Sequence, residues 1–185
     1  MENWLFVDFQ TLGLDPSSAV LSVGLLYVPD NLENYTEESL MSMGEHFCFD
    51  VNKQNRPIDK DTLSYWRMQP KEDLKCFEGY KYTVDEVFNE ICIYLRRERN
   101  NVKFSKNDKV WSKGMIDKFF FQSLFSKFPA EIQHYQWRDS STALDVLTGS
   151  PNGTIKNEEF KIKNNALYNC VMEYKRLREA LKIYE

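Results

Sequence analysis

The chain opens with Trp4-Leu5-Phe6-Val7-Asp8-Phe9-Gln10-Thr11-Leu12-Gly13, an apolar run that ends in an acid and a polar, glycine-containing loop. A second apolar run follows at Val20-Leu21-Ser22-Val23-Gly24-Leu25-Leu26-Tyr27-Val28. Short apolar runs separated by Gly and Pro predict two buried strands joined by a turn. Burial of a carboxylate at a strand end costs free energy unless a cation or hydrogen-bond donors meet it. Asp8 is therefore either a metal ligand or a turn-capping residue.

Length and composition predict one folded domain over residues 1–185. The chain is 42% apolar and 15% aromatic, which excludes a disordered or low-complexity protein. No run approaches the roughly 20 apolar residues of a membrane span, and the N-terminus lacks the pattern of a secretory signal. The four cysteines lie far apart without ligand spacing, which favours reduced thiols and a cytoplasmic protein without a membrane partner.

The net charge of −4 argues against tight, general binding of nucleic acid. Two short basic clusters, at 96–99 and 161–163, are expected to be solvated surface because neither forms a long basic run. Nucleic-acid binding by this chain would depend on a local site.

Two segments carry a resemblance to a known family. Asp8-Phe9-Gln10-Thr11-Leu12-Gly13 resembles the first motif of the DnaQ-like (DEDDh) 3′–5′ exonucleases, Asp-x-Glu-Thr-Leu-Gly, with Gln10 at the Glu position. Residues 58–69 resemble a segment of the phage DexA-type exonucleases and related small bacterial 3′–5′ exoribonucleases, with Tyr65 in place of a Trp. The resemblance implies that Thr11, Leu12 and Gly13 contact the terminal nucleotide.

Two later motifs extend the resemblance. Trp111-Ser112-Lys113-Gly114-Met115-Ile116-Asp117 is similar to the second motif of the family, one residue short, and makes Asp117 a candidate metal ligand. Taken alone, Asp117 is equally well explained as an acid favoured by the dipole of a helix N-terminus. In the third motif, His-x-Ala-Leu-x-Asp-Ala, this chain has Asn164-Asn165-Ala166-Leu167-Tyr168-Asn169-Cys170, so that Asn164 stands at the general base and Asn169 at a metal ligand.

The resemblance implies an α/β fold of the ribonuclease-H-like kind, with a five-stranded mixed sheet flanked by helices. Patterning predicts further strands at 46–51, 108–114 and 134–138, and a loop at 148–154. Residues 29–45 read as a loop or short helix. Helices are predicted at 59–70 with Asp59 as its cap, at 83–97 from a capping box, at 115–128 closed by Pro129, and at 164–183. The segment Trp137–Thr142 is interpreted as structural.

Two-metal phosphodiester hydrolysis requires several carboxylates around two divalent cations. Of the five positions that are catalytic in the family, Asp8 and Asp117 keep an acid, and Gln10, Asn164 and Asn169 carry amides. An amide has no useful basicity near neutral pH, so Asn164 cannot take a proton from water. Because general-base loss alone removes about 10²–10⁴ in rate, we expect catalysis to be absent. Metal binding at Asp8 and Asp117 is then weak or missing.

Two functions remain open. The first is a degenerate exonuclease-fold protein that needs no cofactor and binds a single-stranded nucleic-acid 3′ end or a protein partner. The abundance of Lys, Asn, Tyr and Phe would suit a phage-encoded accessory or host-interference factor. The second is an active 3′–5′ exonuclease on single-stranded RNA or DNA that uses Mg²⁺ or Mn²⁺, Asp8, Asp117 and another ligand such as Glu173. The sequence gives no oligomeric state.

Overall fold

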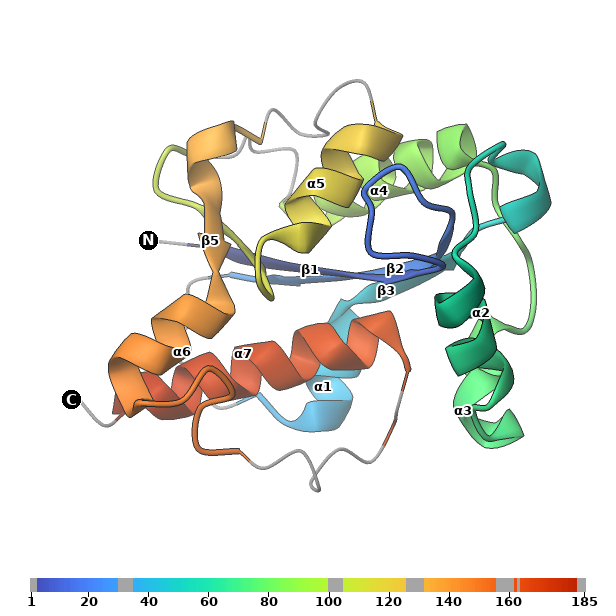
Figure 1. The fold of residues 1–185 in the computed structure, drawn as a ribbon. Coiled ribbons are helices and arrows are strands. Elements are labelled where there is room, and N and C mark those ends of the chain that lie inside the picture. Colours follow the sequence, from blue (N-terminus) through green and yellow to red (C-terminus); the bar gives the residue numbers. More distant parts are fainter. Residues whose placement is uncertain are drawn as a thin grey trace.

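The computed structural model describes residues 3–29, 35–99, 105–125, 132–155, 162 and 164–182, and these contain a five-stranded sheet in the order β3-β2-β1-β4-β5 (Figure 1). The strands are β1 Trp4–Thr11, β2 Val20–Val28, β3 Glu45–Cys48, β4 Lys109–Ser112 and β5 Trp137–Asp139. The α-helices are α1 Glu37–Met43, α2 Lys60–Arg67, α3 Lys71–Leu74, α4 Val84–Glu98, α5 Ile116–Leu124, α6 Ser140–Thr148 and α7 Ala166–Lys182, and short 3₁₀ turns are η1 Val51–Lys53, η2 Lys75–Phe77 and η4 His134–Gln136. Strands β1, β2 and β3 pair antiparallel, whereas β4 and β5 run parallel to β1. The predicted mixed sheet flanked by helices is confirmed.

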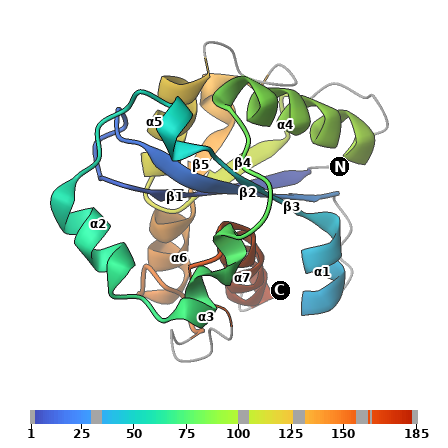
Figure 2. The same ribbon diagram turned by 90° about the vertical axis from the view of Figure 1, so that its right-hand side faces the viewer.

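Helices cover both faces of the sheet (Figures 1 and 2). Helices α4 and α5 lie on one face, and α1, α6 and α7 lie on the other. Side chains of β1 alternate between these two layers, since successive residues of a strand point to opposite faces. Leu5, Val7 and Phe9 are buried in the core under α4 and α5. Phe6 is buried against α7, and its alternation partner Asp8 consequently faces the α7 side.

Side-chain caps fix where several helices begin. The predicted capping box at α4 is present: Glu86 N donates to Thr83 Oγ1 at 3.3 Å, and Thr83 N donates to Glu86 Oε2 at 2.7 Å. Asp59 caps α2 as predicted, because its Oδ1 accepts from Thr62 N at 2.7 Å. These caps satisfy amides that have no partner inside the helix. Both predictions rested on local sequence, and both are confirmed.

Three strand predictions differ from the structure. Strand β1 does not end at Asp8 but continues to Thr11, because pairing with β2 persists through Gln10↔Ser22. The third strand covers 45–48, and the predicted continuation to 51 turns into η1. In the predicted fifth strand, residues 134–136 form η4, since Gln133 N donates to Gln136 Oε1 at 2.7 Å and closes the turn. Strand β5 begins only at Trp137.

Helix α6 was not predicted from the sequence. Asp139 caps this helix by accepting from Ser141 N at 3.0 Å and from Thr142 Oγ1 at 2.7 Å. A run of Asp, Ser and Thr forms turns as readily as helix caps, so the pattern alone did not separate the two. Helix α5 is shorter than the predicted 115–128, and its predicted end at Phe128 and Pro129 lies outside the described residues, as does the predicted last residue of α7, Ile183.

A glycine lets α7 approach the middle of the sheet. Gly24 is the register partner of Asp8, and a Cβ built on Gly24 would lie 2.2 Å from Ala166 C and from Leu167 N. A real Cβ cannot come so close to backbone atoms. The glycine therefore allows the first turn of α7 to sit directly over the strand pair that carries Asp8.

Candidate functional site

Asp8 lies inside β1 and is hydrogen-bonded by two amide side chains. Its Oδ2 accepts from Gln10 Nε2 at 2.9 Å and from Asn169 Nδ2 at 3.1 Å. Gln10 comes from the same strand, two residues on, and Asn169 comes from α7, which the contact at Gly24 brings close. Three of the predicted site positions thus meet at one carboxylate. The orientation of each amide follows from the hydrogen-bond network, in which only the NH₂ group can donate to a carboxylate.

Asp117 reaches the same place from the first turn of α5. It is buried, at 4% exposure, and its Oδ1 accepts from the backbone N of Phe9 at 2.9 Å. The sharp turn before the helix places it there, since Gly114 and Met115 both have positive φ, at 73° and 59°. The acid does sit at a helix N-terminus, yet its partner is the strand that carries Asp8.

The pKa values of both carboxyl groups are raised. Burial raises the pKa of Asp8 to about 7, against the opposing effect of the two amide hydrogen bonds. Burial raises the pKa of Asp117 well above its usual range, and the charge of Asp8 adds to this rise. Both shifts follow from the cost of placing negative charge where neither water nor a cation solvates it.

Glu173, the alternative ligand, is bound elsewhere. Its Oε1 accepts from Arg176 Nη1 at 2.6 Å, and its Oε2 accepts from Ser140 Oγ at 2.9 Å. Arg176 is only 1% exposed, so this is a buried ion pair. A buried carboxylate with an arginine and a hydroxyl as partners has two fewer lone-pair directions left for a cation.

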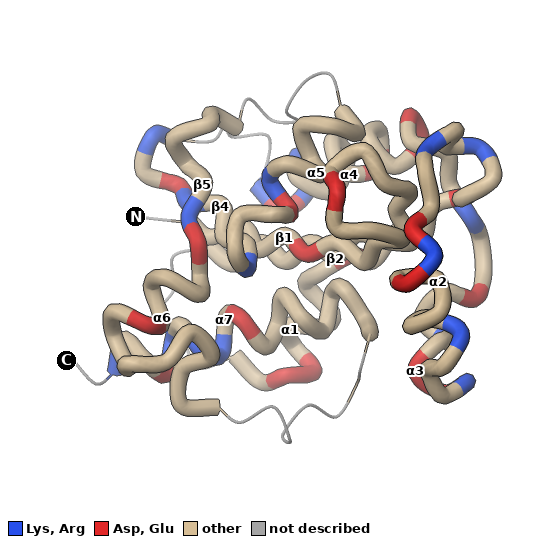
Figure 3. Tube along the Cα trace, viewed as in Figure 1, with Lys and Arg blue, Asp and Glu red and all other residues tan. Residues whose placement is uncertain are grey.

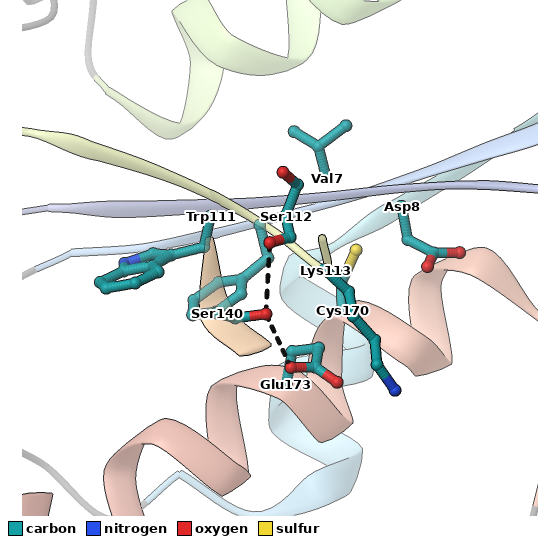
Figure 4. Close-up of a pocket in the computed structure, with 9 residues that line it drawn as sticks. Val7, Asp8, Trp111, Ser112, Lys113, Ser140, Cys170 and Glu173 are labelled. Carbon is teal, nitrogen blue, oxygen red and sulfur yellow. Dashed lines mark hydrogen bonds between the residues drawn. The ribbon is translucent and has the colours of Figure 1, made fainter. Parts of the chain in front are cut away.

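A small cavity of about 10 Å³ separates Asp8 from Glu173 and is lined in part by Ser112, Lys113 and Cys170 (Figure 4). That volume is no larger than the space a single water molecule needs. Lys113 runs along this space, and its Nζ donates to Asn152 Oδ1 at 3.1 Å. The charge of Lys113 lowers the pKa of Asp8, although less than burial raises it. Lys113 lies within the second family motif, but the sequence analysis predicted no role for it.

Asn164 is not joined to Asp8. Its Nδ2 donates to Gln69 Oε1 at 3.1 Å, and its Oδ1 accepts from Tyr65 Oη at 3.4 Å. Its backbone has φ of 57°, in the left-handed region that Asn tolerates better than most residues. Cys76 Sγ completes the attachment by donating to Asn164 O at 3.2 Å. The general-base position is therefore tied to α2 and the 3₁₀ turn η2. Tyr65 and Gln69 belong to the segment that resembles the family, but their contacts with Asn164 were not predicted from the sequence.

The segment Thr11–Gly13 is fixed by hydrogen bonds to α2 and within itself. Thr11 O accepts from Trp66 Nε1 at 2.8 Å, and Thr11 Oγ1 donates to Gly13 O at 2.8 Å. Leu12 is buried, at 4% exposure, in a small core with Trp66. Leu14, the next side chain along the loop, is 85% exposed. This segment therefore exposes Leu14, whereas Leu12 and Gly13 are buried.

The described side chains at this site offer few anionic oxygens to a pair of hard divalent cations. Such ions take oxygen ligands, preferably anionic ones. Here the NH₂ groups of Gln10 and Asn169 face Oδ2 of Asp8, and Glu173 is paired with Arg176. Among the described residues, no three His, Cys, Asp or Glu side chains come together as a possible metal site. Reversing both amides would offer neutral carbonyls and would break both hydrogen bonds to Asp8.

Charges of both signs are interspersed along the described part of the chain (Figure 3). Of the predicted basic clusters, Arg97 pairs with Glu45 at 2.9 Å and is solvated, whereas Arg99 is buried, so that part of the surface prediction is wrong. Lys161 and Lys163 lie outside the described residues. No helix in the described ranges is long and apolar enough to cross a membrane.

Comparison with known proteins decides the family. Residues 3–181 match the family described as the 3′-5′ exoribonuclease Rv2179c-like domain, which is nearly the whole chain. The chain belongs to this family. No curated protein matches the sequence significantly.

Solved structures similar to this Rv2179c-like chain include exonucleases. Exonuclease X in complex with 5′ overhanging duplex DNA matches with a TM-score of 0.56 at 12% identity, over 97% of this chain and 92% of that one. Pop2p of S. pombe, in a form with Mg²⁺ and Mn²⁺ bound, matches with a TM-score of 0.58 at 11% identity, over 98% and 83%. An E. coli ExoI–ssDNA complex in its metal-free form matches with a TM-score of 0.58 at 11% identity, and the chain spans 41% of that chain. At such low identity these likenesses show the ribonuclease-H-like fold alone, as predicted.

Proposed function

We propose that this Rv2179c-like domain does not hydrolyse nucleic acid and instead binds the 3′ end of a single strand without a divalent metal. The observation that carries the proposal is the pair of amide hydrogen bonds from Gln10 and Asn169 to Asp8 Oδ2. In a two-metal mechanism the carboxylate at this position would face a cation. Amide NH₂ groups take over the stabilisation of the carboxylate, and they do so without activating water.

Three features of the site support the loss of hydrolysis. The pKa values of Asp8 and Asp117 are raised, Glu173 is paired with Arg176, and Asn164 offers an amide to Gln69 and Tyr65. Asn164 stands at the general-base position, and an amide cannot take a proton from water near neutral pH. Loss of a general base and loss of metal affinity act on the same step, so their effects compound.

Exposed apolar groups beside the site support binding of unpaired bases. Leu14 is 85% exposed at the tip of the β1–β2 loop, and the ring of Tyr65 is 48% exposed next to Asn164. Aromatic side chains such as Tyr65 stack on bases in a sequence-tolerant manner, at about 1–3 kcal/mol per base, and Leu14 offers an apolar contact. Reduced negative charge at Asp8 and Asp117 lowers the repulsion that a phosphate would meet there. The metal-free E. coli ExoI–ssDNA complex has the same fold, though it is only 11% identical.

A cleavage and retention experiment tests the proposal. The protein is incubated with 5′-labelled single-stranded RNA and DNA in Mg²⁺ or Mn²⁺, beside an Asp8→Ala control, and binding is measured at low salt in EDTA. We expect strands of unchanged length and binding that survives EDTA. Shortening that the Asp8→Ala protein lacks would overturn the loss of hydrolysis. Absence of binding to either strand would overturn the nucleic-acid role and leave a protein partner, to be sought by pull-down from host extract.

The second candidate is an active exonuclease that uses Mg²⁺ or Mn²⁺. Family membership favours it, as does the hydrogen bond from the backbone N of Phe9, the residue after Asp8, to Asp117. The same cleavage experiment decides between the two.

A further inference from the structure

The loop that carries Leu14 is fixed by a residue outside the family motifs. Arg56 lies on the segment between η1 and α2, which runs beside the β1–β2 loop. Its Nε donates to Ser18 O at 2.9 Å, and its Nη2 donates to Pro16 O. The guanidinium therefore binds two carbonyls of the loop at once.

The same guanidinium reaches helix α5 on its other side. Its Nη1 donates to Ser123 O at 3.2 Å, and its Nη2 donates to Ser123 Oγ at 2.8 Å. Helix α5 also supplies Asp117, whose carboxylate accepts from Phe9 N in β1. Arg56 thus joins the Leu14 loop to the far end of the helix whose near end forms the site.

Neighbouring contacts extend this attachment along the chain. Gln54 forms a reciprocal pair with Val20, since Val20 N donates to Gln54 Oε1 at 2.9 Å and Gln54 Nε2 donates to Val20 O at 2.7 Å. Ala19 N donates to Pro57 O at 2.8 Å, and Asp59 N donates to Leu12 O at 2.7 Å. Residues 54–59 therefore bind the loop at both ends, and Arg56 also reaches α5.

We propose that Arg56 is a positioning residue: it fixes the Leu14 loop against α5 and thereby sets the affinity of the site for single-stranded nucleic acid. This inference rests on the proposed function for its binding readout. Four of the five guanidinium N–H donors are used within the protein, so the role that we assign to Arg56 is a geometric one. A lysine keeps the positive charge but has a single nitrogen, which cannot span Ser18 and Ser123 in the planar geometry of an arginine.

Binding across a salt series separates positioning from charge. The proteins compared are the wild type, Arg56→Lys, Arg56→Ala and Lys60→Ala, the last being an exposed cation near Arg56 that takes no part in these contacts. The probe is a 5′-labelled single-stranded 12-mer in EDTA. We expect Arg56→Lys and Arg56→Ala each to weaken binding about tenfold, with an unchanged slope of log Kd against log salt, and Lys60→Ala to bind like the wild type. Wild-type affinity in Arg56→Lys, or a slope reduced by about one, would assign Arg56 to phosphate binding and overturn the inference.

Hydrogen exchange tests the attachment independently of any ligand. The amides of Leu12 and Ser18 donate to Ala19 O and Asp15 O, each at 2.8 Å, and report on loop order. We expect faster exchange at both in Arg56→Ala, with unchanged exchange in α7 as evidence of an intact fold. Unchanged exchange at Leu12 and Ser18 would overturn the positioning role. If the wild type binds no strand while loop exchange does accelerate, the proposed function fails and the attachment by Arg56 stands.

Discussion

Asn169 Nδ2 donates a hydrogen bond to Asp8 Oδ2 at 3.1 Å, joining two residues that are 161 positions apart in the chain. The contact ties the last helix to the first strand. It also stabilises the Asp8 carboxylate without a cation, because an amide dipole from within the protein faces it. Replacing such amides by acids should restore a demand for cations, and this gives the first prediction.

The double variant Gln10→Glu, Asn169→Asp should acquire affinity for Mn²⁺. Four carboxyl groups would then lie around the Asp8 position, and without metal their repulsion should lower the Tm below that of the wild type. Added Mn²⁺ should raise the Tm of the variant, since a ligand at 100 times its Kd stabilises by about 2.7 kcal/mol. The wild type should not respond. Thermal melts with and without Mn²⁺ measure this, and a wild-type shift as large as that of the variant would contradict it.

Asp8→Asn should stabilise the protein at pH 8. Burial raises the pKa of Asp8 to about 7, so its contribution to stability is complete below its unfolded pKa of 3.8 and is lost as the pH rises through 7. Asparagine removes this loss while its carbonyl still accepts from the two amides. We expect a gain of roughly 2–4 kcal/mol at pH 8 that disappears near pH 4.

Urea unfolding at pH 8, 6 and 4 measures the Asp8→Asn effect. Asp15→Asn is the matched control. Hydrogen bonds from Ser17 lower the pKa of Asp15, so removal of this carboxylate should bring no gain in the free energy of unfolding at pH 8. A less stable Asp8→Asn protein at pH 8 would mean that the charged carboxylate is favourable where it lies.

His46 should make the wild type lose stability in mild acid. Burial, with a smaller effect from the charge of Lys81, lowers the pKa of His46 to about 4 from its usual 6.5. Its stabilising contribution is therefore complete above pH 6.5 and is lost as the pH falls towards 4, because only the unfolded chain takes up the proton. The loss is about 3 kcal/mol.

His46→Gln removes the titrating group and should flatten this part of the pH dependence. The measurement is the difference in free energy of unfolding between the two proteins at pH 7.5 and pH 4.5. A difference that does not change between these values would show that His46 is solvated in the folded state.

Gly24→Ala should be among the most damaging single-methyl changes in the chain. Its Cβ would lie 2.2 Å from two backbone atoms of α7, and backbone cannot move aside as a flexible side chain would. We expect a loss of about 3 kcal/mol or more, or a Tm lower by on the order of 10 °C. Gly79→Ala is the control: its φ is 96° but nothing lies within 4 Å, so only local backbone strain of about 1–2 kcal/mol should appear. Equal Tm values for the two variants would contradict the close contact.

The sequence by itself determined the elements whose signals are local. The two opening strands, the cap at Asp59 and the capping box at Thr83 follow from residues within a few positions of one another, and all are present in the structure. Local signals also identified Gln10 and Asn169 as amides at positions where the family has acids. Local signals did not predict η4 and α6. In η4 the side chain of Gln136 closes a turn where a strand was expected, and at α6 the side chain of Asp139 caps a helix.

Only the tertiary structure decided what those amides do. Asn169 points its NH₂ at Asp8 because Gly24 lets α7 approach the sheet, whereas Asn164 is held by Gln69 and Tyr65 of a distant segment. The pairing of Glu173 with Arg176 and Ser140 and the attachment of the Leu14 loop by Arg56 likewise join residues from separate elements. Such contacts depend on distances across the folded chain, and these distances cannot be predicted from periodicity and residue type.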